Sequence, residues 1–375
     1  MIAADLIIVL TAALVAVAGS LLGVFLVLRR QSMLSDAISH AVLPGIVGAF
    51  WLSGGTATVP ALIGAAAMGL LTVLSVELLE RSGRVKVDAA IGVVFPLLFS
   101  IGVILVSLYF RNVHLDMDAV LYGEIAYAPL NTVIFLGREV PESLLLMGTL
   151  ALLNAAFVGL CYKELKVGTF DAGLAATLGF APTAVHYLLM TLLSFTTVGA
   201  FQSVGAILIV AFVIIPPASA YLLTRQLSRM LRLSLVIGVV SSAAGYALAL
   251  WLDTSIAGMI ASVLGVVFTL SLLFSPEQGV VTTLARRARQ REDFTARLLL
   301  TALHGEQRYT PAAIARRLDW DETRTRRALE YARRAGWVRL DGDRVERLTA
   351  APVPAHGASP VPGPRAAHRN ASQVP

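Results

Sequence analysis

Nine long apolar segments fill the first 279 residues of this chain and limit what it can fold into. A helix needs about 20 consecutive apolar residues to cross the hydrocarbon core of a membrane. Segments of this length lie at residues 5–28, 34–53, 60–79, 89–110, 143–162, 182–201, 204–223, 233–251 and 256–274. Only 14% of the residues are charged, against about 25% in an ordinary soluble domain. We therefore predict an all-α, polytopic transmembrane bundle of about eight or nine spans over residues 1–279.

The basic residues between these segments indicate how the spans are oriented. Short cytoplasmic loops carry an excess of Lys and Arg. The first segment shows no signal-peptide cleavage pattern, so we expect it to remain as a span. We also expect an odd number of spans, with the N-terminus outside and the C-terminus in the cytoplasm. The basic residues fall on alternate connections, at Arg29, Arg30, Arg81, Arg84, Lys86, Lys163, Lys166, Arg225, Arg229 and Arg232.

Asp36 and His40 place a carboxylate and an imidazole inside the second apolar segment. Residues i and i+4 share one face of a helix, so both side chains can reach one ligand. Counted from Arg30 at about 1.5 Å per residue, His40 lies about 15 Å deep, near the middle of the membrane. Ionisable residues at that depth are costly and indicate a substrate or ion path. The alternative is that both are helix-terminal polar groups, with Asp36 capping the helix.

Two residues that lie four and five positions after His40 are expected to alter the helix backbone. Pro44 has no N–H to give to the carbonyl of His40, and Gly45 allows another helix to approach closely. An opened backbone beside two polar side chains suits ion binding. A simple packing kink is the alternative explanation for the proline.

Four stretches of the chain resemble the permease subunits of ABC importers for manganese, zinc and iron. The resemblance covers roughly residues 1–275, with the stretches in the same order as in that family. They are Ser35-Asp36-Ala37-Ile38-Ser39-His40-Ala41-Val42-Leu43-Pro44-Gly45, Asp88-Ala89-Ala90-Ile91-Gly92, Leu115-Asp116-Met117-Asp118-Ala119-Val120-Leu121-Tyr122-Gly123, and Val204-Gly205-Ala206-Ile207-Leu208 continuing to Ile215-Pro216-Pro217-Ala218.

The resemblance implies a cargo for the Asp36–His40 pair. In such a permease the two side chains contact a transported divalent ion, and Pro44, Gly45 and Pro216 belong to the backbone of the pathway. Because Cys161 is the single cysteine, the chain offers mainly nitrogen and oxygen ligands, which first-row divalent ions accept. Mn²⁺ is favoured, with Zn²⁺ and Fe²⁺ as the other candidates. We expect no permanently bound cofactor.

The resemblance also implies partners in a bacterial plasma membrane. These are a second permease copy, in a homodimer or a pseudo-symmetric heterodimer, a cytosolic ABC ATPase, an extracytoplasmic metal-binding protein and membrane lipid. The chain has no Gly-Lys pair and so no P-loop, and we expect ATP hydrolysis in a separate subunit rather than an enzymatic activity here.

A short segment between the fifth and sixth spans is the best candidate for docking that ATPase. Asp171 is predicted to cap its helix and Gly179 to end it, while Phe170, Leu174 and Leu178 recur every four residues as one apolar face. The alternative is an interfacial helix that rests on lipid.

Other polar residues rank lower as metal ligands. Asp88 is as easily a helix cap or ion-pair partner as a ligand at the exit. His114, Asp116 and Asp118 in the outer connection either funnel cations or form a solvated acidic loop, and the second is favoured. His186 is expected to be a hydrogen-bonded interior histidine.

The last 96 residues differ in character from the rest. Residues 280–375 carry a net charge of +8, against −2 for residues 1–279. Residues 280–349 are predicted to form a helix, then a helix-turn-helix, then a hairpin that turns at Asp341-Gly342. In the helix-turn-helix, Pro311 begins the first helix, and the second is an arginine-rich helix at 321–335. This order of elements resembles a cytosolic winged-helix domain. Pro, Ala, Gly and Ser dominate residues 350–375, which we expect to be a disordered tail.

Two roles suit such an appendage. One is DNA contact through the arginine-rich helix. The other is regulation or subunit contact, with the arginines facing anionic lipid or the ATPase. We favour the second, because a tethered domain searches DNA poorly and this one carries ten acidic residues. For the whole chain, the alternatives to an ABC importer permease are an ion-coupled secondary metal transporter and a membrane-bound metal sensor that acts through this appendage.

Overall fold

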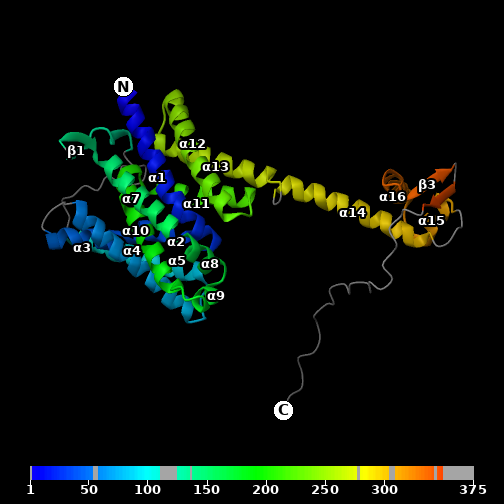
Figure 1. Ribbon diagram of the computed structural model, residues 1–375, viewed down its shortest axis with the longest axis horizontal. Helices are drawn as coiled ribbons and strands as arrows, with labels where there is room; N and C mark the ends of the chain where they lie inside the picture. Colours follow the sequence, from blue (N-terminus) through cyan, green and yellow to red (C-terminus); the bar gives the residue numbers. More distant parts are fainter. Residues whose placement is uncertain are drawn as a thin grey trace, which may run out of the picture. The chain divides into compact units, whose positions relative to one another are not determined.

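Figure 1 shows the protein as a computed structural model, which describes residues 2–53, 58–109, 125–135, 137–276, 279–303, 309–341 and 344–348. The chain divides into two compact units, Met1–Val280 and Val281–Pro375. Each unit has a hydrophobic core of its own.

The first unit is a bundle of helices. Nine helical segments within the described residues are long and apolar enough to cross a membrane, which confirms the predicted all-α bundle. The second of these segments is formed jointly by α2 and α3. The helices are α1 (Ile2–Leu28), α2 (Met33–Ala41), α3 (Leu43–Ser53), α4 (Thr58–Arg81), α5 (Val87–Tyr109), α7 (Glu142–Leu160), α10 (Pro182–Val204), α11 (Ala206–Leu223), α12 (Leu227–Leu252) and α13 (Ile256–Phe274).

Helix α1 is central to this unit and packs against α7, α11 and α12. Its residues Ala12, Ala16 and Ala18 are fully buried, since such small side chains let neighbouring helices approach. Helix α10 turns directly into α11 at Gly205, whose φ of 84° is a left-handed value that favours glycine. Pro216 is buried within α11.

The helix of the second span is broken near Pro44, as the sequence predicts. Helix α2 ends at Ala41 and α3 begins at Leu43, because Pro44 cannot donate a hydrogen bond to the carbonyl of His40. The N–H groups of Gly45 and Ile46 instead both donate to the carbonyl of Val42, at 2.9 and 3.1 Å.

Gly45 also makes the close helix approach that the sequence predicts. A Cβ atom added at Gly45 would overlap the backbone carbonyl of Gly64 on α4, and one added at Gly64 would overlap the carbonyl of Gly45. Pro44 in turn packs against Gly102 of α5, where an added Cβ would lie 2.9 Å from the proline Cδ. The break therefore lies between α4 and α5.

Short elements join the spans. They are the 3₁₀ helix η1 (Ile125–Tyr127), the strands β1 (Thr132–Phe135) and β2 (Arg138–Pro141), and the helices α8 (Tyr162–Phe170) and α9 (Ala172–Thr177). The strands pair in antiparallel register, with Val133 opposite Val140. The sequence patterns predicted a connection here but not this hairpin.

The second unit combines three helices with a hairpin. Its elements are α14 (Val280–Ala302), α15 (Pro311–Leu318), α16 (Glu322–Arg334), β3 (Val338–Asp341) and β4 (Arg344–Arg347). The side chain of Thr310 caps α15, with Pro311 at its first position, and Asp321 caps α16. Leu299, Leu303, Ile314, Leu329 and Val345 are buried in its core.

Strands β3 and β4 pair with Asp341 opposite Arg344. The hairpin therefore closes one residue later than the predicted turn at Asp341-Gly342. Residues 342 and 343, like the predicted tail at 350–375, lie outside the described residues.

Candidate functional site

Asp36 and His40 lie one turn apart on α2 and face the same way. Asp36 Oδ1 lies 3.5 Å from His40 Nε2, and the Asp36 and His40 side chains are 44% and 34% exposed. The His40 ring packs against two aromatic rings of α5, with centroid distances of 5.6 Å to Phe95 and 6.4 Å to Phe99. The pair is thus supported from one side by α5 and open on the other.

The Asp36–His40 pair supplies at most one carboxylate and one imidazole to an ion. Protein sites for Zn²⁺ use three or four protein ligands, and octahedral sites for ions such as Mn²⁺ use six positions in total. Within the described part of the chain, no group of three or more His, Cys, Asp and Glu side chains could hold a metal ion. Among the described residues, the pair therefore brings together one carboxylate and one imidazole of the ligands that such a site needs.

Asp88 lies away from this pair. It sits exposed in the first turn of α5, seven residues before Phe95, the residue whose ring contacts His40. At about 1.5 Å per residue this places Asp88 about 10 Å along α5 from the level of His40. His114, Asp116 and Asp118 lie outside the described residues.

The segment predicted to dock an ATPase forms two short helices rather than one. Asp171 caps α9, and its side chain accepts a hydrogen bond of 2.9 Å from the N–H of Leu174. Gly179 follows the end of α9 with a φ of 83°. Phe170 is the last residue of α8, so its predicted place on one helical face with Leu174 and Leu178 is wrong, because the extended backbone of Asp171 separates the two helices. All three apolar side chains are nevertheless exposed, by 65%, 49% and 57%.

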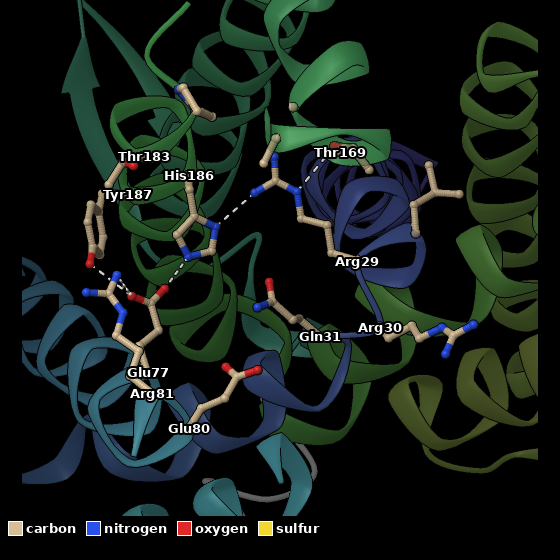
Figure 2. A pocket seen from close by; sticks show the side chains of 14 residues that line it. Arg29, Arg30, Gln31, Glu77, Glu80, Arg81, Thr169, Thr183, His186 and Tyr187 are labelled. Carbon is tan, nitrogen blue, oxygen red and sulfur yellow. Dashed lines mark hydrogen bonds and ion pairs between the residues drawn. The ribbon is translucent and has the colours of Figure 1, made fainter. Parts of the chain in front are cut away.

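A polar cavity of about 750 Å³ lies where the ends of α1, α4, α8 and α10 meet. Figure 2 shows the His186 ring between the Arg29 guanidinium and the Glu77 carboxylate. The Arg29 Nη1 atom lies 2.8 Å from His186 Nδ1, and His186 Nε2 lies 2.5 Å from Glu77 Oε1. Arg29 Nε also donates to Thr169 Oγ1 at 3.2 Å, and the Tyr187 hydroxyl donates to Glu77 Oε2 at 2.9 Å. His186 is thus hydrogen-bonded, as the sequence led us to expect.

The partners of His186 fix which ring nitrogen carries the proton. A guanidinium can only donate, so His186 Nδ1 accepts from Arg29. Nε2 then carries the proton and donates it to Glu77. Burial lowers the pKa of the Arg29 guanidinium from its ordinary value, but an arginine remains charged at neutral pH. The result is a chain of two hydrogen bonds, in which Arg29 donates to His186 and His186 donates to Glu77.

One residue in the sequence points to this cavity. Glu77 is an ionisable residue within an apolar segment, and such residues usually face a partner or a polar space. Its hydrogen-bond partners, His186 and Tyr187, come from α10, more than a hundred residues away in the chain, and no local pattern indicates that pairing.

Comparison with known proteins gives a consistent result for the first unit. A sequence model of the ABC 3 transport family matches residues 6–275. The manganese transport system membrane protein MntD of Bacillus subtilis is 50% identical over 276 residues, which cover 73% of this chain and 93% of MntD. The chelated iron transport system membrane protein YfeC of Yersinia pestis is 34% identical over 271 residues, which cover 72% of this chain and 86% of YfeC.

One relative also matches part of the second unit. The zinc transport system membrane protein TroD of Treponema pallidum is 45% identical over 345 residues, which cover 89% of this chain and 93% of TroD. Because the first unit holds 280 of the 375 residues, a match of this extent reaches beyond it.

A solved structure has the same fold as the transmembrane unit. PsaBC from Streptococcus pneumoniae, in complex with Fab, contains a chain that is 30% identical, with a TM-score of 0.61 over 72% of this chain and 91% of that one. The residues that the family model matches, 6–275, include the Asp36–His40 pair and the candidate spans of the described residues, except for the first two residues of the first span. This chain therefore belongs to the ABC 3 transport family, the permease subunits of ABC-type metal transport systems.

Proposed function

We propose that this chain is the permease subunit of an ATP-driven importer that carries a divalent transition metal ion across a bacterial plasma membrane past Asp36 and His40. The observation that carries the proposal is the half-exposed Asp36–His40 pair within a membrane-spanning segment. Relatives are named as manganese, zinc and iron transport proteins. Mn²⁺ is the favoured cargo, since the manganese protein MntD shares 50% identity against 45% for the zinc protein TroD.

A second permease copy would complete the site. On its open side, the pair offers an ion one carboxylate and one imidazole. A twofold-related copy would contribute its own Asp36 and His40 from the opposite side of a shared pathway. The two carboxylates would make the pathway negative and offset part of the cost of bringing a dication into a medium of low dielectric constant.

The remaining partners follow from this arrangement. We propose that the N-terminus lies outside and the C-terminus in the cytoplasm, with the ends of α1, α4 and α7 on the cytoplasmic side, because basic residues such as Arg29, Arg81 and Lys163 lie there and short cytoplasmic loops are rich in Lys and Arg. The exposed leucines of the α9 segment lie on that side and would dock the ATPase. An extracytoplasmic metal-binding protein would deliver the ion at the opposite surface.

An uptake assay can test whether ATP supplies the energy for transport. We expect the full chain, co-expressed with its cognate ATPase, to co-purify with it and to take up radiolabelled Mn²⁺ in proteoliposomes only when ATP is supplied. Uptake should stop when the ATPase carries an inactive nucleotide site and should persist when a proton ionophore is added. Uptake that needs no ATPase and follows a proton gradient would instead identify an ion-coupled secondary transporter.

A shortened chain separates transport from signalling in the same assay. The match to MntD covers 73% of this chain and 93% of MntD, which supports transport without a second unit. We propose that the second unit, which resembles a winged-helix domain, serves regulation or subunit contact rather than DNA binding. A chain that ends at Gly279 should therefore still import Mn²⁺ with ATP, and complete loss of import with normal ATPase binding would contradict that role.

A charge placed on the α9 segment can test whether this segment docks the ATPase. Leu174→Asp places a charge on an exposed apolar side chain of α9 and should reduce co-purified ATPase at least about tenfold, because burying an unpaired carboxylate costs several kcal/mol. Ala176→Asp is the matched control, since residue 176 is also exposed but points about 200° away around the helix. Equal loss in both variants would show that the leucine face is not the docking surface.

A further inference from the structure

We propose that Arg29 is a positioning residue that ties the α8–α9 segment to the start of α2, the helix that carries Asp36 and His40. The inference rests on the proposed function, because it assigns to the polar cavity a part in coupling ATP hydrolysis to metal transport. Three observations carry it: the position of Arg29 in the chain, its hydrogen bond to Thr169, and the orientation that His186 and Glu77 impose on it.

Arg29 lies in the tight turn between α1 and α2. Only four residues separate Leu28, the last residue of α1, from Met33, the first of α2. The turn is held to the end of α1, since the N–H groups of Arg30 and Gln31 donate to the carbonyls of Val27 and Leu26 at 3.1 and 2.9 Å. It is also held to α2, because the N–H of Leu34 donates to the carbonyl of Gln31 at 3.0 Å. A force on Arg29 therefore acts on the base of α2.

The hydrogen bond from Arg29 to Thr169 reaches the proposed docking segment. Thr169 is the next-to-last residue of α8, two residues before Asp171, whose side chain caps α9. The bond runs from Arg29 Nε to Thr169 Oγ1 over 3.2 Å and joins residues 140 positions apart. When a docked ATPase moves α9, this bond passes the displacement to the α1–α2 turn.

His186 and Glu77 set the direction in which the Arg29 fork points. His186 Nδ1 accepts from Arg29, and its Nε2–H is directed at Glu77 Oε1, so the ring cannot turn without losing both bonds. Glu77 is itself held, because its other oxygen accepts from Tyr187 and lies 3.7 Å from Arg81. Helix α4, which carries Glu77, packs directly against α2. Arg29 is thus fixed relative to α4, α8 and α10.

The acidic residues of the cavity suggest another role, a second cation site on the exit path. The charges of the cavity disfavour that role. Its lining includes Arg29, Arg30 and Arg81 against Glu77 and Glu80, which leaves a positive balance. Both oxygens of Glu77 are already engaged. A dication would meet net repulsion here, whereas the space of about 750 Å³ leaves these side chains room to rearrange during a transport cycle.

The test measures the number of Mn²⁺ ions imported per ATP hydrolysed by the full chain with its ATPase in proteoliposomes. Thr169→Val keeps the shape of the side chain but removes the oxygen that accepts the hydrogen bond from Arg29. Arg29→Lys keeps the positive charge but loses the planar guanidinium that contacts Thr169 and His186 at the same time. Each should lower the ratio about tenfold while hydrolysis continues, because a hydrogen bond to a charged group is lost. The double variant should lower it no further than Arg29→Lys alone.

Thr183→Val is the matched control. Thr183 lines the same cavity, is exposed, and has no hydrogen bond from its hydroxyl among the residues that the structure describes. Its ratio should stay at the wild-type value. A network that only stabilises the fold would lower the melting temperature and reduce hydrolysis and import together, leaving the ratio unchanged, and that result in Thr169→Val would overturn the proposal. If the proposed function itself is wrong, the wild-type complex will fail to import Mn²⁺ with ATP, an outcome that these variants do not mimic.

Discussion

Replacing Asp36 or His40 with alanine is expected to reduce ATP-dependent Mn²⁺ uptake by about 100-fold or more while the permease still assembles with its ATPase. Each variant removes one of the two side chains that we propose as ligands, and in a twofold assembly it would remove one from each side. Loss of groups that merely support metal ligands already costs about 10- to 100-fold in affinity or activity, and loss of a ligand should cost more. Assembly should survive, because a half-exposed pair at 3.5 Å contributes little to stability.

Ser39→Ala provides the matched control for these variants. Ser39 lies between the pair on α2 but is buried, and its hydroxyl donates to the carbonyl of Ser35 on the same helix at 2.8 Å. It does not share the open face, so its uptake should stay within about twofold of wild type. The measurement is the initial rate of radiolabelled Mn²⁺ uptake per assembled complex. Undiminished uptake by the Asp36→Ala and His40→Ala double variant would remove the pair from the transport path.

The sequence alone predicts those parts of this protein that depend on residues close together in the chain. The spans follow from uninterrupted apolar length, and the break at Val42 follows from Pro44 two residues later. The Asp36–His40 pair follows from the spacing of one helical turn. Each of these features is decided within about one span, so no knowledge of the neighbouring helices is needed.

The polar cavity could not be predicted in that way. Arg29 and His186 are 157 residues apart, and His186 and Glu77 are 109 apart, so their contact depends on how α1, α4 and α10 pack. Nothing in the stretch around Arg29 distinguishes it from an ordinary basic residue at the end of a span. The position of Phe170 shows a limit at shorter range, because the spacing of apolar residues does not reveal that Asp171 interrupts the helix.

Gly45→Ala is expected to destabilise the transmembrane unit strongly. The new Cβ would overlap the backbone carbonyl of Gly64, and neither atom belongs to a side chain that can rotate away. Helices α3 and α4 must therefore separate, at a cost of about 1–3 kcal/mol or more. The displacement also reaches the proposed metal site, because Pro44 packs against α5, the helix whose Phe95 supports His40. We expect a melting temperature in detergent lower by several degrees, together with reduced uptake per complex.

Gly48→Ala isolates this effect, because Gly48 lies on the same helix one turn later and an added Cβ there would meet no atom within 4 Å. In a helix interior alanine is favoured over glycine by about 0.5–1 kcal/mol, so this variant should melt at the wild-type temperature or slightly above it. The two alanine variants therefore share chemistry and location and differ in whether α4 is in contact. Opposite shifts would show that the α3–α4 approach holds the broken second span in place. Equal melting temperatures would mean that α3 and α4 can move apart freely, and the position of His40 would then not depend on this contact.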